Sequence, residues 1–569
     1  MSDIKVTDYI VETLIKSGVD TVFGYPGGAI CHLMDSLGKY SDKIACKINF
    51  HEQAAAFAAC GYAQTGKRLG VAFATSGPGA TNLVTGIADA WFDSLPVLFL
   101  TGQVDTYALK STTGADIRQF GFQETDILSI VKSISKYSVQ ITSPDQICRE
   151  LNKAIDIAMS GRKGPVVIDL PADVQRAMVD VGKLEIYTKE NTVAQECDFA
   201  ELFNDLSSAT RPVVLAGAGI NQADLRQEFR QFVERYQLPT VVSFPACDLL
   251  EYDHRLHLGF IGVNGHRYAN LVLAKSDCVI CLGSRLDLKQ VGAQKDFFRP
   301  ETKVIRIDVD AEELKLPVRA NETVYCCDLK AFFREAEKGV VDLKNRDGNW
   351  VDIANGIKKE LEFANDNEPV HKLLRGISQN VSADLTYALD VGQNELWAAQ
   401  ALELKGNQRL IMSAGLGTMG YAVPAAIGAY YATKNPAVAI VGDGGLQMNI
   451  QELQFIASNK LPVTVILCNN SSLGMIRQFQ EKFLNSNFQH TTLTTGYSVP
   501  DFKLIAEAYG LKYQLLTDLK EFRYSERDSK LIELRLPDTT YLHPAFGRDA
   551  KYDQEPKIDR DLFSKIMKV

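Results

Sequence analysis

The chain has 569 residues, of which 46% are hydrophobic and 23% are charged, and its formal net charge is −9. This length exceeds what one hydrophobic core supports, so we expect three or four domains. The acidic balance argues against nucleic-acid binding, and no apolar run reaches the roughly 18 residues that a membrane span needs. The first residues predict an amphipathic helix and not a signal peptide, so a cytoplasmic location is expected.

Strand-like and helical patterns alternate along residues 1–180, which we interpret as the first domain. Such alternation predicts a doubly wound parallel sheet with helices on both faces. The polar, unpatterned stretch 181–200 is expected to be a linker. The predicted strands are 20–23, 45–49, 69–74, 96–101, the segment KYSVQI at 136–141, and 166–170, and the predicted helices are 5–17, 52–63 and 80–92.

Two further blocks of the same kind follow, at 200–340 and 373–545. The charged stretch 338–372 is predicted to be a linker with some helix. Residues 546–569 are predicted to form a polar tail with prolines. The predicted fold class is therefore α/β, with three doubly wound parallel-sheet domains. The predicted strands are 212–216, 239–242, 278–282, 303–308, 386–390, 409–413, 438–441, 462–468 and 530–535.

The third block contains VAIVGDGGLQMNIQELQFIASNKLPVTVILCNN, which predicts two parallel strands joined by a helix at 450–458. Asp443 and Asn470 follow these two strands, so both side chains should lie at the carboxyl edge of the sheet. A carboxylate and an amide oxygen suit Mg²⁺, and the glycines of GDGG allow backbone amides to approach phosphates. The competing interpretation is an ordinary turn in which Asp443 caps a helix.

The first block places Glu52 directly after a strand, at the start of the small-residue helix of FHEQAAAFAACGYAQTGK. Another element could pack closely against such a helix, and desolvation would then raise the pKa of Glu52. The competing interpretation is a first-turn glutamate that the helix dipole stabilises. Glycine-rich turns at 24–30 and 75–82 follow other strands of the same block.

Two sets of potential metal ligands show no metal-site spacing. Cys278 and Cys281 form a CxxC in an apolar strand without a second pair nearby, so buried thiols are favoured over zinc or redox chemistry. His254, His257 and His266 lack matching acids or thiols, and we interpret them as structural or surface residues.

Several longer stretches share one pattern. The first block contains YPGGA, FHEQAAAFAACGYAQTGK, TSGPGATNLVTGIADA and FGFQETDI, and the third contains DVGQNELWAAQ, GLGTMGYAVPAAIGA, GDGGLQMNIQEL and LGMIRQFQ. With these stretches the whole chain resembles the acetolactate synthase branch of the thiamine-diphosphate-dependent enzymes. The resemblance implies a pyrimidine-binding first domain, a flavin-binding type of central domain and a diphosphate-binding third domain.

The resemblance assigns roles to residues of both end domains. Glu52 would hydrogen-bond a pyrimidine nitrogen of thiamine diphosphate, and Met419 would hold the cofactor in a V shape. The implied ligands of Mg²⁺ are Asp443, Asn470 and the carbonyl of Ser472. The implied residues on the substrate side are Phe122, Gln123 and Lys136. Further implied cofactor contacts are Tyr25, Gly27, Gly28, Pro78, Asn82, Gly392, Gln393, Asn394, Gly442, Gly444, Gly445 and Met475.

The central block matches the flavin-binding pattern of the same family in LAGAGIN, GHRYAN, LGSRLD and IRIDVD. The resemblance implies a bound FAD that does not change its redox state during turnover. A vestigial, empty domain is the alternative interpretation. The implied FAD contacts are Gly217, Gly219, Gly265, Arg285 and Asp308.

Three departures from the family pattern concern the second substrate. Phe479 occupies the place of a tryptophan, and Leu288-Lys289 occupies the place of an Asp-Arg pair. Lysine keeps the charge of arginine but loses its two-pronged grip on a carboxylate. The tail sequence also differs from that of family members that make branched-chain amino-acid precursors.

The predicted function is a carboligase that decarboxylates a 2-keto acid, pyruvate, and transfers the two-carbon unit to a carbonyl acceptor. Lys289 and Phe479 would line the acceptor pocket, and their departures predict weak selectivity for a second 2-keto acid. Alternatives are transfer to an aldehyde, ketone or nucleotide-linked keto sugar, or a pyruvate oxidase or decarboxylase. Because family members build each site from two subunits, the resemblance implies a homodimer or homotetramer.

Overall fold

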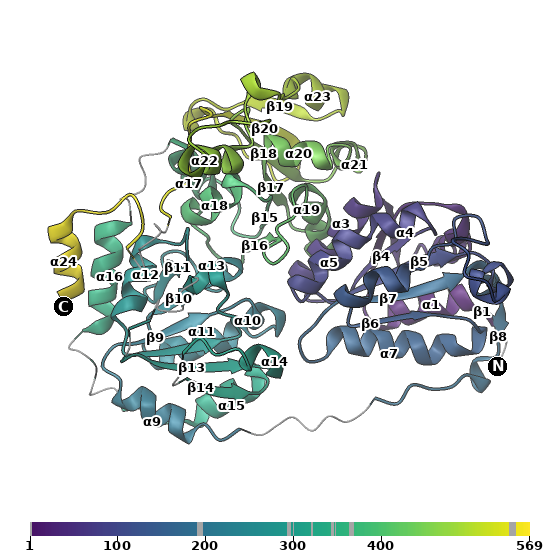
Figure 1. The fold of residues 1–569 in the computed structure, drawn as a ribbon, viewed down its shortest axis with the longest axis horizontal. Coiled ribbons are helices and arrows are strands. Elements are labelled where there is room, and N and C mark those ends of the chain that lie inside the picture. Colours follow the sequence, from purple (N-terminus) through teal and green to yellow (C-terminus); the bar gives the residue numbers. More distant parts are fainter. Residues whose placement is uncertain are drawn as a thin grey trace.

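The computed structural model describes residues 3–189, 197–292, 298–299, 301–319, 322–342, 346, 349–362, 369–545 and 553–568. Within these ranges the chain forms three six-stranded parallel sheets and a small two-stranded one. Figure 1 shows the first domain at the right, the central domain at the lower left and the third domain above them. No helix in the described ranges is long and apolar enough to cross a membrane.

The first domain has the strand order β3-β2-β4-β5-β7-β6, and every neighbouring pair in this sheet is parallel. Side chains alternate between its faces, as strand geometry requires: Phe73 and Leu98 pack against α1, α2 and α7, whereas Ala72 and Phe99 face α3 and α5. The strands are β2 (Thr21–Gly24), β3 (Ala45–Ile48), β4 (Gly70–Ala74), β5 (Val97–Gln103), β6 (Tyr137–Gln140) and β7 (Val166–Pro171). The main helices are α1 (Val6–Lys16), α2 (Cys31–Lys39), α3 (Glu52–Gly66), α4 (Pro78–Asn82), α5 (Val84–Phe92) and α7 (Ile147–Met159).

The third domain repeats this topology in the order β16-β15-β17-β18-β20-β19, again with parallel neighbours. Its strands are β15 (Thr386–Leu389), β16 (Arg409–Met412), β17 (Ala437–Gly442), β18 (Val463–Asn469), β19 (Lys512–Leu515) and β20 (Lys530–Arg535). Its helices are α17 (Pro369–Gln379), α18 (Gln393–Ala401), α19 (Ala422–Thr433), α20 (Asp443–Met448), α21 (Glu452–Ser458), α22 (Gly474–Phe483) and α23 (Phe502–Ala508).

The central domain has a different order, β11-β10-β9-β12-β13-β14, which is the order of many dinucleotide-binding sheets. Its strands are β9 (Pro212–Ala216), β10 (Thr240–Val242), β11 (His257–Phe260), β12 (Cys278–Leu282), β13 (Lys303–Asp308) and β14 (Thr323–Cys326). Its helices include α9 (Ala200–Ser208), α11 (Arg226–Arg235), α12 (Arg267–Lys275), α13 (Leu288–Val291), α14 (Ala311–Leu314), α15 (Leu329–Lys338) and α16 (Trp350–Leu361).

Each six-stranded sheet has a switch point, where the strand order reverses and ligands of α/β proteins usually bind. It lies between β2 and β4 in the first domain, between β9 and β12 in the central domain and between β15 and β17 in the third. The glycine-rich stretches 24–30, 75–82, 217–219, 283–285 and 442–445 directly follow these strands. The topology thus brings the predicted motifs to the edges where ligands bind.

Helices α3 and α19 join the first and third domains through a close backbone contact. A Cβ atom added at Gly428 would lie 1.9 Å from the carbonyl oxygen of Ala58, and one at Gly61 would lie 2.3 Å from that of Ala425. Any larger side chain at either glycine would therefore separate the helices. The alanine-rich sequence of α3 is thus explained by packing against a second helix, as the sequence predicted.

Arg409 connects all three domains. Its Nε donates to the buried Asp248 carboxylate of the central domain at 2.6 Å. Its terminal nitrogens donate to the carbonyl oxygens of Gln64 and Thr65, at the end of α3, at 3.4 and 3.5 Å. One guanidinium therefore helps to fix the relative positions of the sheets.

Residues 553–568 of the predicted tail fold back onto the central domain, and the rest of that tail lies outside the described residues. Its helix α24 (Arg560–Lys568) ends where the buried Lys275 donates to the carbonyl oxygen of Ile566 at 2.6 Å. Arg267 donates to the carbonyls of Gln554 and Pro556 at 2.6 and 2.7 Å. Basic side chains of α12 thus hold this part of the tail against the central domain by hydrogen bonds to its backbone carbonyls.

Most predicted strands are observed, with ends within a few residues of the predicted ones. Several other elements were not predicted. Strands β11, β14 and β19 were missed, as was the antiparallel pair of β1 (Ile4–Lys5) and β8 (Met178–Val179). β11, β14 and β19 lie at sheet edges, where a strand lacks the continuous apolar run of a central one. The predicted helix 80–92 is divided into α4 and α5, and 450–458 corresponds to α21.

All eleven cysteines lie in described residues and are free thiols. Cys278 and Cys281 are buried in β12. His257 is also buried and His266 is half-buried, and desolvation lowers the pKa of each to about 3. Neutral imidazoles at these positions agree with the structural role that the sequence suggested.

We expect Gly428→Ala to lower the midpoint of thermal unfolding by several degrees. Overpacking typically costs about 1–3 kcal/mol, and each kcal/mol shifts the midpoint by about 2–4 °C in larger domains. Gly356→Ala is the control, because this exposed glycine of α16 has nothing within 4 Å of its added Cβ. Equal midpoints for the two variants, measured by differential scanning calorimetry, would contradict the tight crossing.

Candidate active site

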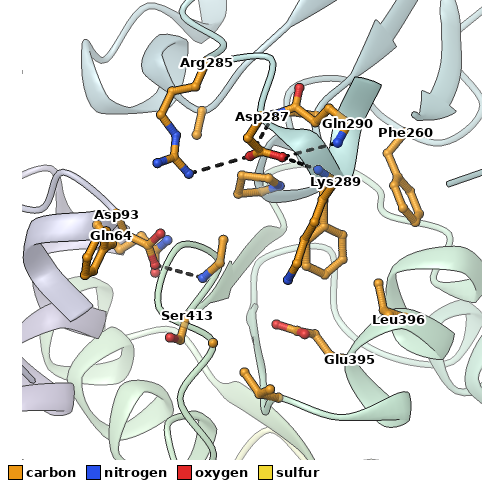
Figure 2. A pocket seen from close by; sticks show the side chains of 18 of the residues that line it. Gln64, Asp93, Phe260, Arg285, Asp287, Lys289, Gln290, Glu395, Leu396 and Ser413 are labelled. Atoms are coloured by element: carbon orange, nitrogen blue, oxygen red, sulfur yellow. Dashed lines mark hydrogen bonds and ion pairs between the residues drawn. The ribbon is translucent and has the colours of Figure 1, made fainter. Parts of the chain in front are cut away.

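A cavity of about 880 Å³ lies where the three domains meet. This volume falls in the upper part of the range for ligand pockets, about 300–1,000 Å³. The loops after β9, β12 and β13 form one wall, and the loops after β15, β17 and β18 form another. The first domain contributes the ends of α3 and α5, including Gln64 and Asp93 (Figure 2), and the end of α7 with the loop that follows it.

Asp443 lies at the third-domain end of the cavity, at the start of α20. Its Oδ1 accepts a hydrogen bond from Tyr497 at 2.6 Å, and its Oδ2 accepts one from the backbone N–H of Asn470 at 3.0 Å. Burial raises the pKa of Asp443, and the bond from Tyr497 acts in the opposite direction. A bound cation would favour the charged form of this carboxylate.

Asn470 and Ser472 follow β18, the neighbour of β17, and are buried beside Asp443. Asn470 Oδ1 accepts from the backbone N–H of Ser472 at 3.3 Å, which fixes the turn. One carboxylate, one amide oxygen and one carbonyl are hard oxygen ligands of the kind that Mg²⁺ uses. Among the described residues, no group of three or more His, Cys, Asp or Glu side chains could hold a metal ion. A metal here would therefore use mixed oxygen ligands.

Two glycines keep this end of the cavity compact. Gly392 has φ +150°, and a Cβ there would lie 2.5 Å from Oδ1 of Asn394. A Cβ on Gly445 would lie 2.1 Å from Oδ1 of Asp390. Both positions therefore require glycine, and the first turns of α18 and α20 begin at the cavity wall, where backbone N–H groups can bind phosphate.

The opposite end of the cavity belongs to the central domain. Gly219, Arg285 and Asp308 line it, from the loops after β9, β12 and β13. Arg285 pairs with Asp287 at 3.7 Å, and Asp308 accepts from the backbone N–H of Asp310 at 2.9 Å. A guanidinium and a carboxylate at a switch point can bind the phosphates and the ribose hydroxyls of a dinucleotide.

Between the two ends, Lys289 and Glu395 face one another from opposite walls (Figure 2). Glu395 lies in the first turn of α18 and is only 8% exposed, and its Oε1 has no hydrogen-bond partner in the described structure. Burial raises the pKa of Glu395 well above its ordinary value, and the charge of Lys289 partly opposes this shift. The described residues place no carboxylate in ion-pair contact with Lys289.

The switch-point loops of the first domain form a separate cluster. Asn82 donates to Oε2 of Glu52 at 2.9 Å, and the backbone N–H of Ala29 donates to Oγ1 of Thr75 at 3.1 Å. Glu52 is 8% exposed and does not line the cavity. The two predicted halves of the cofactor site therefore do not share one cavity within the chain.

The cavity brings together most of the predicted residues of the central and third domains. Those that line it are Gly219, Arg285, Lys289, Asp308, Gly392, Gln393, Asn394, Met419, Gly442, Asp443, Gly444, Gly445, Asn470, Ser472 and Met475. Those that do not line it are Tyr25, Gly27, Gly28, Glu52, Pro78, Asn82, Phe122, Gln123, Lys136, Gly217, Gly265 and Phe479.

The residues outside the cavity have varied surroundings. Phe122 is 85% exposed, and Phe479 is 53% exposed on α22. Lys136 is partly buried, and its Nζ donates to the carbonyls of Ile157 and Ser160 at the end of α7. Burial lowers the pKa of Lys136 to about 8. The functions predicted for these residues remain predictions.

Sequence reasoning did not assign several residues that belong to the site. Tyr497 bonds to Asp443 across 54 residues of chain, and no local pattern could have indicated it. Arg162 lines the cavity and joins the first domain to Asp310 and Glu313 at 2.8 and 2.7 Å. Glu395 carried only a weak signal, because it is an acid directly before the apolar residues LWAA.

The fold and the cavity agree with comparisons to known proteins. Three family models match the chain, all described as parts of a thiamine pyrophosphate enzyme: the N-terminal TPP-binding domain at 4–130, the central domain at 199–335 and the C-terminal TPP-binding domain at 390–528. These matches define the class as thiamine-diphosphate-dependent enzymes.

Relatives over nearly the full length narrow the class. The acetolactate synthase large subunit of Lactococcus lactis is 36% identical, covering 94% of this chain and 93% of its own. The acetolactate synthase isozyme 2 large subunit of Escherichia coli is 34% identical over 90% of each chain. A probable acetolactate synthase large subunit of Methanocaldococcus jannaschii is 34% identical over 99% of this chain and 98% of its own. The chain belongs to the acetolactate synthase family of thiamine-diphosphate-dependent enzymes.

Proposed function

We propose that the protein is a carboligase that decarboxylates pyruvate and transfers the two-carbon unit to a carbonyl acceptor, in the manner of an acetolactate synthase. The observation that carries this proposal is the cavity itself, which joins a cofactor end at Asp443 to a polar centre at Lys289 and Glu395. Because the relatives are named acetolactate synthases, a second 2-keto acid is favoured as acceptor over an aldehyde or a keto sugar. The test is mass analysis of the products from pyruvate, with and without candidate acceptors.

Thiamine diphosphate and Mg²⁺ fit the third-domain end of the cavity. Asp443, Asn470 and the carbonyl of Ser472 would hold the metal, because together they offer hard oxygen donors on adjacent strand ends. Gln393 and Asn394 would contact the diphosphate, and Met419 lines the same wall. When bound, the cofactor supplies an electron sink for the two-carbon unit that a 2-keto acid leaves on losing carbon dioxide.

Glu52 would serve the pyrimidine ring of the cofactor, and we infer that it does so in a second copy of the chain. The proposal rests on the separation of its loop cluster from the cavity and on the exposed apolar side chains around both. In the first domain Phe122, which precedes Gln123, is exposed. In the third domain Ile476 and Phe479 of α22 are exposed. Such surfaces commonly mark interfaces. A homodimer or a homotetramer would complete each site.

We also propose that FAD binds the central-domain end of the cavity, as a structural group that is not oxidised or reduced in turnover. The strand order of this domain, its cavity wall and the charges of Arg285 and Asp308 suit a dinucleotide. A cytoplasmic location is supported by the eleven free thiols, which favour a reducing compartment.

Replacing either metal-binding side chain should abolish activity and weaken cofactor binding. Opposite unit charges about 4 Å apart near a protein surface interact by about 4 kcal/mol, so Asp443→Ala should cost at least about a hundredfold in Mg²⁺-dependent cofactor affinity. Asn470→Ala should act in the same direction. Titration of cofactor and Mg²⁺ by fluorescence quenching measures the change. The exposed Asp384 of the same domain provides the control, Asp384→Ala. Full activity of metal-stripped Asp443→Ala protein would rule out this metal site.

Mixing two inactive variants tests the shared site. Glu52→Gln should bind cofactor but turn over at least about a hundredfold more slowly, because it removes an acid–base group. Co-expression with Asp443→Ala should restore about a quarter of wild-type activity, since a two-fold symmetric hybrid contains one site with both residues intact. If both residues acted within one chain, the hybrids would remain inactive.

The flavin assignment predicts a yellow protein whose absorbance spectrum does not change when pyruvate is added without oxygen. Arg285→Ala should weaken FAD binding by about one to two decades, because a charge-assisted hydrogen bond contributes about 1.5–3 kcal/mol. Arg255→Ala, an exposed arginine that pairs with Asp352, is the control. Bleaching by pyruvate would indicate an oxidase, and a colourless protein unable to take up FAD would contradict the cofactor.

A further inference from the structure

Glu395 is a cavity residue to which the proposed cofactor binding assigns no role. Its carboxyl group is nine-tenths buried, and Oε1 has no hydrogen-bond partner among the described residues. A buried polar group without a partner costs free energy, so such groups normally have a function or a ligand. Glu395 follows Gln393 and Asn394, the predicted diphosphate contacts, in the first turn of α18. Its side chain lies in the middle of the cavity, between the predicted diphosphate contacts and Lys289.

Charged groups on several elements act on this carboxyl group. Asp390 precedes α18, and Asp89 and Asp93 belong to α5 and its end; all three raise the pKa of Glu395 further, after burial itself. Lys289 on α13 acts in the opposite direction. The surroundings thus favour a protonated Glu395, with a cation close enough to stabilise the carboxylate once the proton has left.

The other acidic residues that line the cavity already have partners. Asp93 accepts from the backbone N–H groups of Ala414 and Gly415 at 2.9 and 2.7 Å. The partners of the remaining acids are Lys289 N–H and Gln290 for Asp287, Asp310 N–H for Asp308, Arg162 for Glu313, Lys330 N–H for Asp328, and Tyr497 and Asn470 N–H for Asp443. Among the acids of the described cavity wall, Glu395 is thus the one with a buried carboxyl oxygen that lacks a hydrogen-bond partner.

We propose that Glu395 is the general acid of the ligation step and that Lys289 stabilises its conjugate base. This inference rests on the proposed carboligation. The two-carbon nucleophile gives an electron pair to the carbonyl carbon of the acceptor, and a carbon–carbon bond forms. The π pair of the carbonyl moves onto its oxygen, which takes the proton of Glu395. The resulting carboxylate faces the Lys289 ammonium and takes up a proton from water before the next turnover.

The assignment does not depend on which acceptor the protein uses, because every carbonyl acceptor needs this proton. It predicts that donor and acceptor chemistry respond differently to substitution. Loss of carbon dioxide from pyruvate needs no proton on the acceptor, whereas formation of the new bond does. Glu395 should therefore affect the second half of the reaction and leave the first half largely intact.

The experiment uses the purified full-length protein with thiamine diphosphate, Mg²⁺ and pyruvate. In Glu395→Gln we expect acetolactate formation to fall at least about a hundredfold, the usual contribution of a general acid. Carbon dioxide release, measured with ferricyanide as an artificial oxidant of the two-carbon unit, should stay within about threefold of wild type, because that step does not use the acid. Glu395→Asp keeps a carboxyl group and should retain more ligation than Glu395→Gln.

Glu150→Gln is the matched control, because it removes a buried carboxyl group from α7, on the opposite face of the first sheet from α3. It should not change the ratio of ligation to carbon dioxide release. Unchanged ligation in Glu395→Gln would overturn the proposal, and so would an equal loss of both activities. If wild-type protein released carbon dioxide but formed no ligation product with any acceptor, the proposed function itself would fail.

The pH profile provides a second test that does not depend on the rate of Glu395→Gln. A required acid makes ligation fall as the pH rises through its pKa. Lys289 lowers that pKa, so Lys289→Met should move the falling limb to higher pH, and Glu395→Gln should remove it. If the falling limb of the pH profile lay at the same pH in wild type and in Lys289→Met, the proposed effect of Lys289 on Glu395 would be contradicted.

Discussion

The close crossing of α3 and α19 is the contact on which the rest of the structure depends. Gly61 and Gly428 allow the two backbones to touch, and this contact fixes the first sheet against the third. Glu452 adds to it, since its carboxylate accepts from Asn49 and from the backbone N–H of Phe50, both at 2.8 Å. The loop that precedes Glu52 is therefore held by the third domain, although Glu52 itself lies outside the cavity.

The arrangement of the three sheet edges determines which parts of the proposed site lie together within one chain. The carboxyl edges of the central and third sheets meet across one cavity, whereas the switch-point loops of the first sheet cluster elsewhere. The first domain reaches the cavity through the ends of α3 and α5, as Gln64 and Asp93 show in Figure 2, and through the end of α7 with the loop that contains Arg162. This geometry agrees with a site that needs a second subunit, because both halves keep their motifs intact but separate.

Buried acids shape the cavity in two different ways. Asp93 and Asp390 accept backbone N–H groups at both ends of the loop 413–422, which carries Met419. Burial raises the pKa of each to about 6, and these hydrogen bonds oppose the shift. Glu395 has no such bond to Oε1, so its desolvation is not offset by the protein. The carboxyl groups of Asp93 and Asp390 thus hold a loop in place, whereas Oε1 of Glu395 has no partner among the described residues and is available to a substrate.

The sequence by itself determined the fold class, the approximate strands and the family, because these depend on local periodicity and on contiguous motifs. It also indicated Asp443 and Asn470, since parallel strands joined by one helix must end at the same edge. It could not determine contacts between distant residues, such as Tyr497 with Asp443 or Arg409 with Asp248, nor edge strands such as β14 and β19. Only the tertiary structure decided that Lys289 and Glu395 face one another and that Glu52 lies outside the cavity, because both depend on how the domains pack.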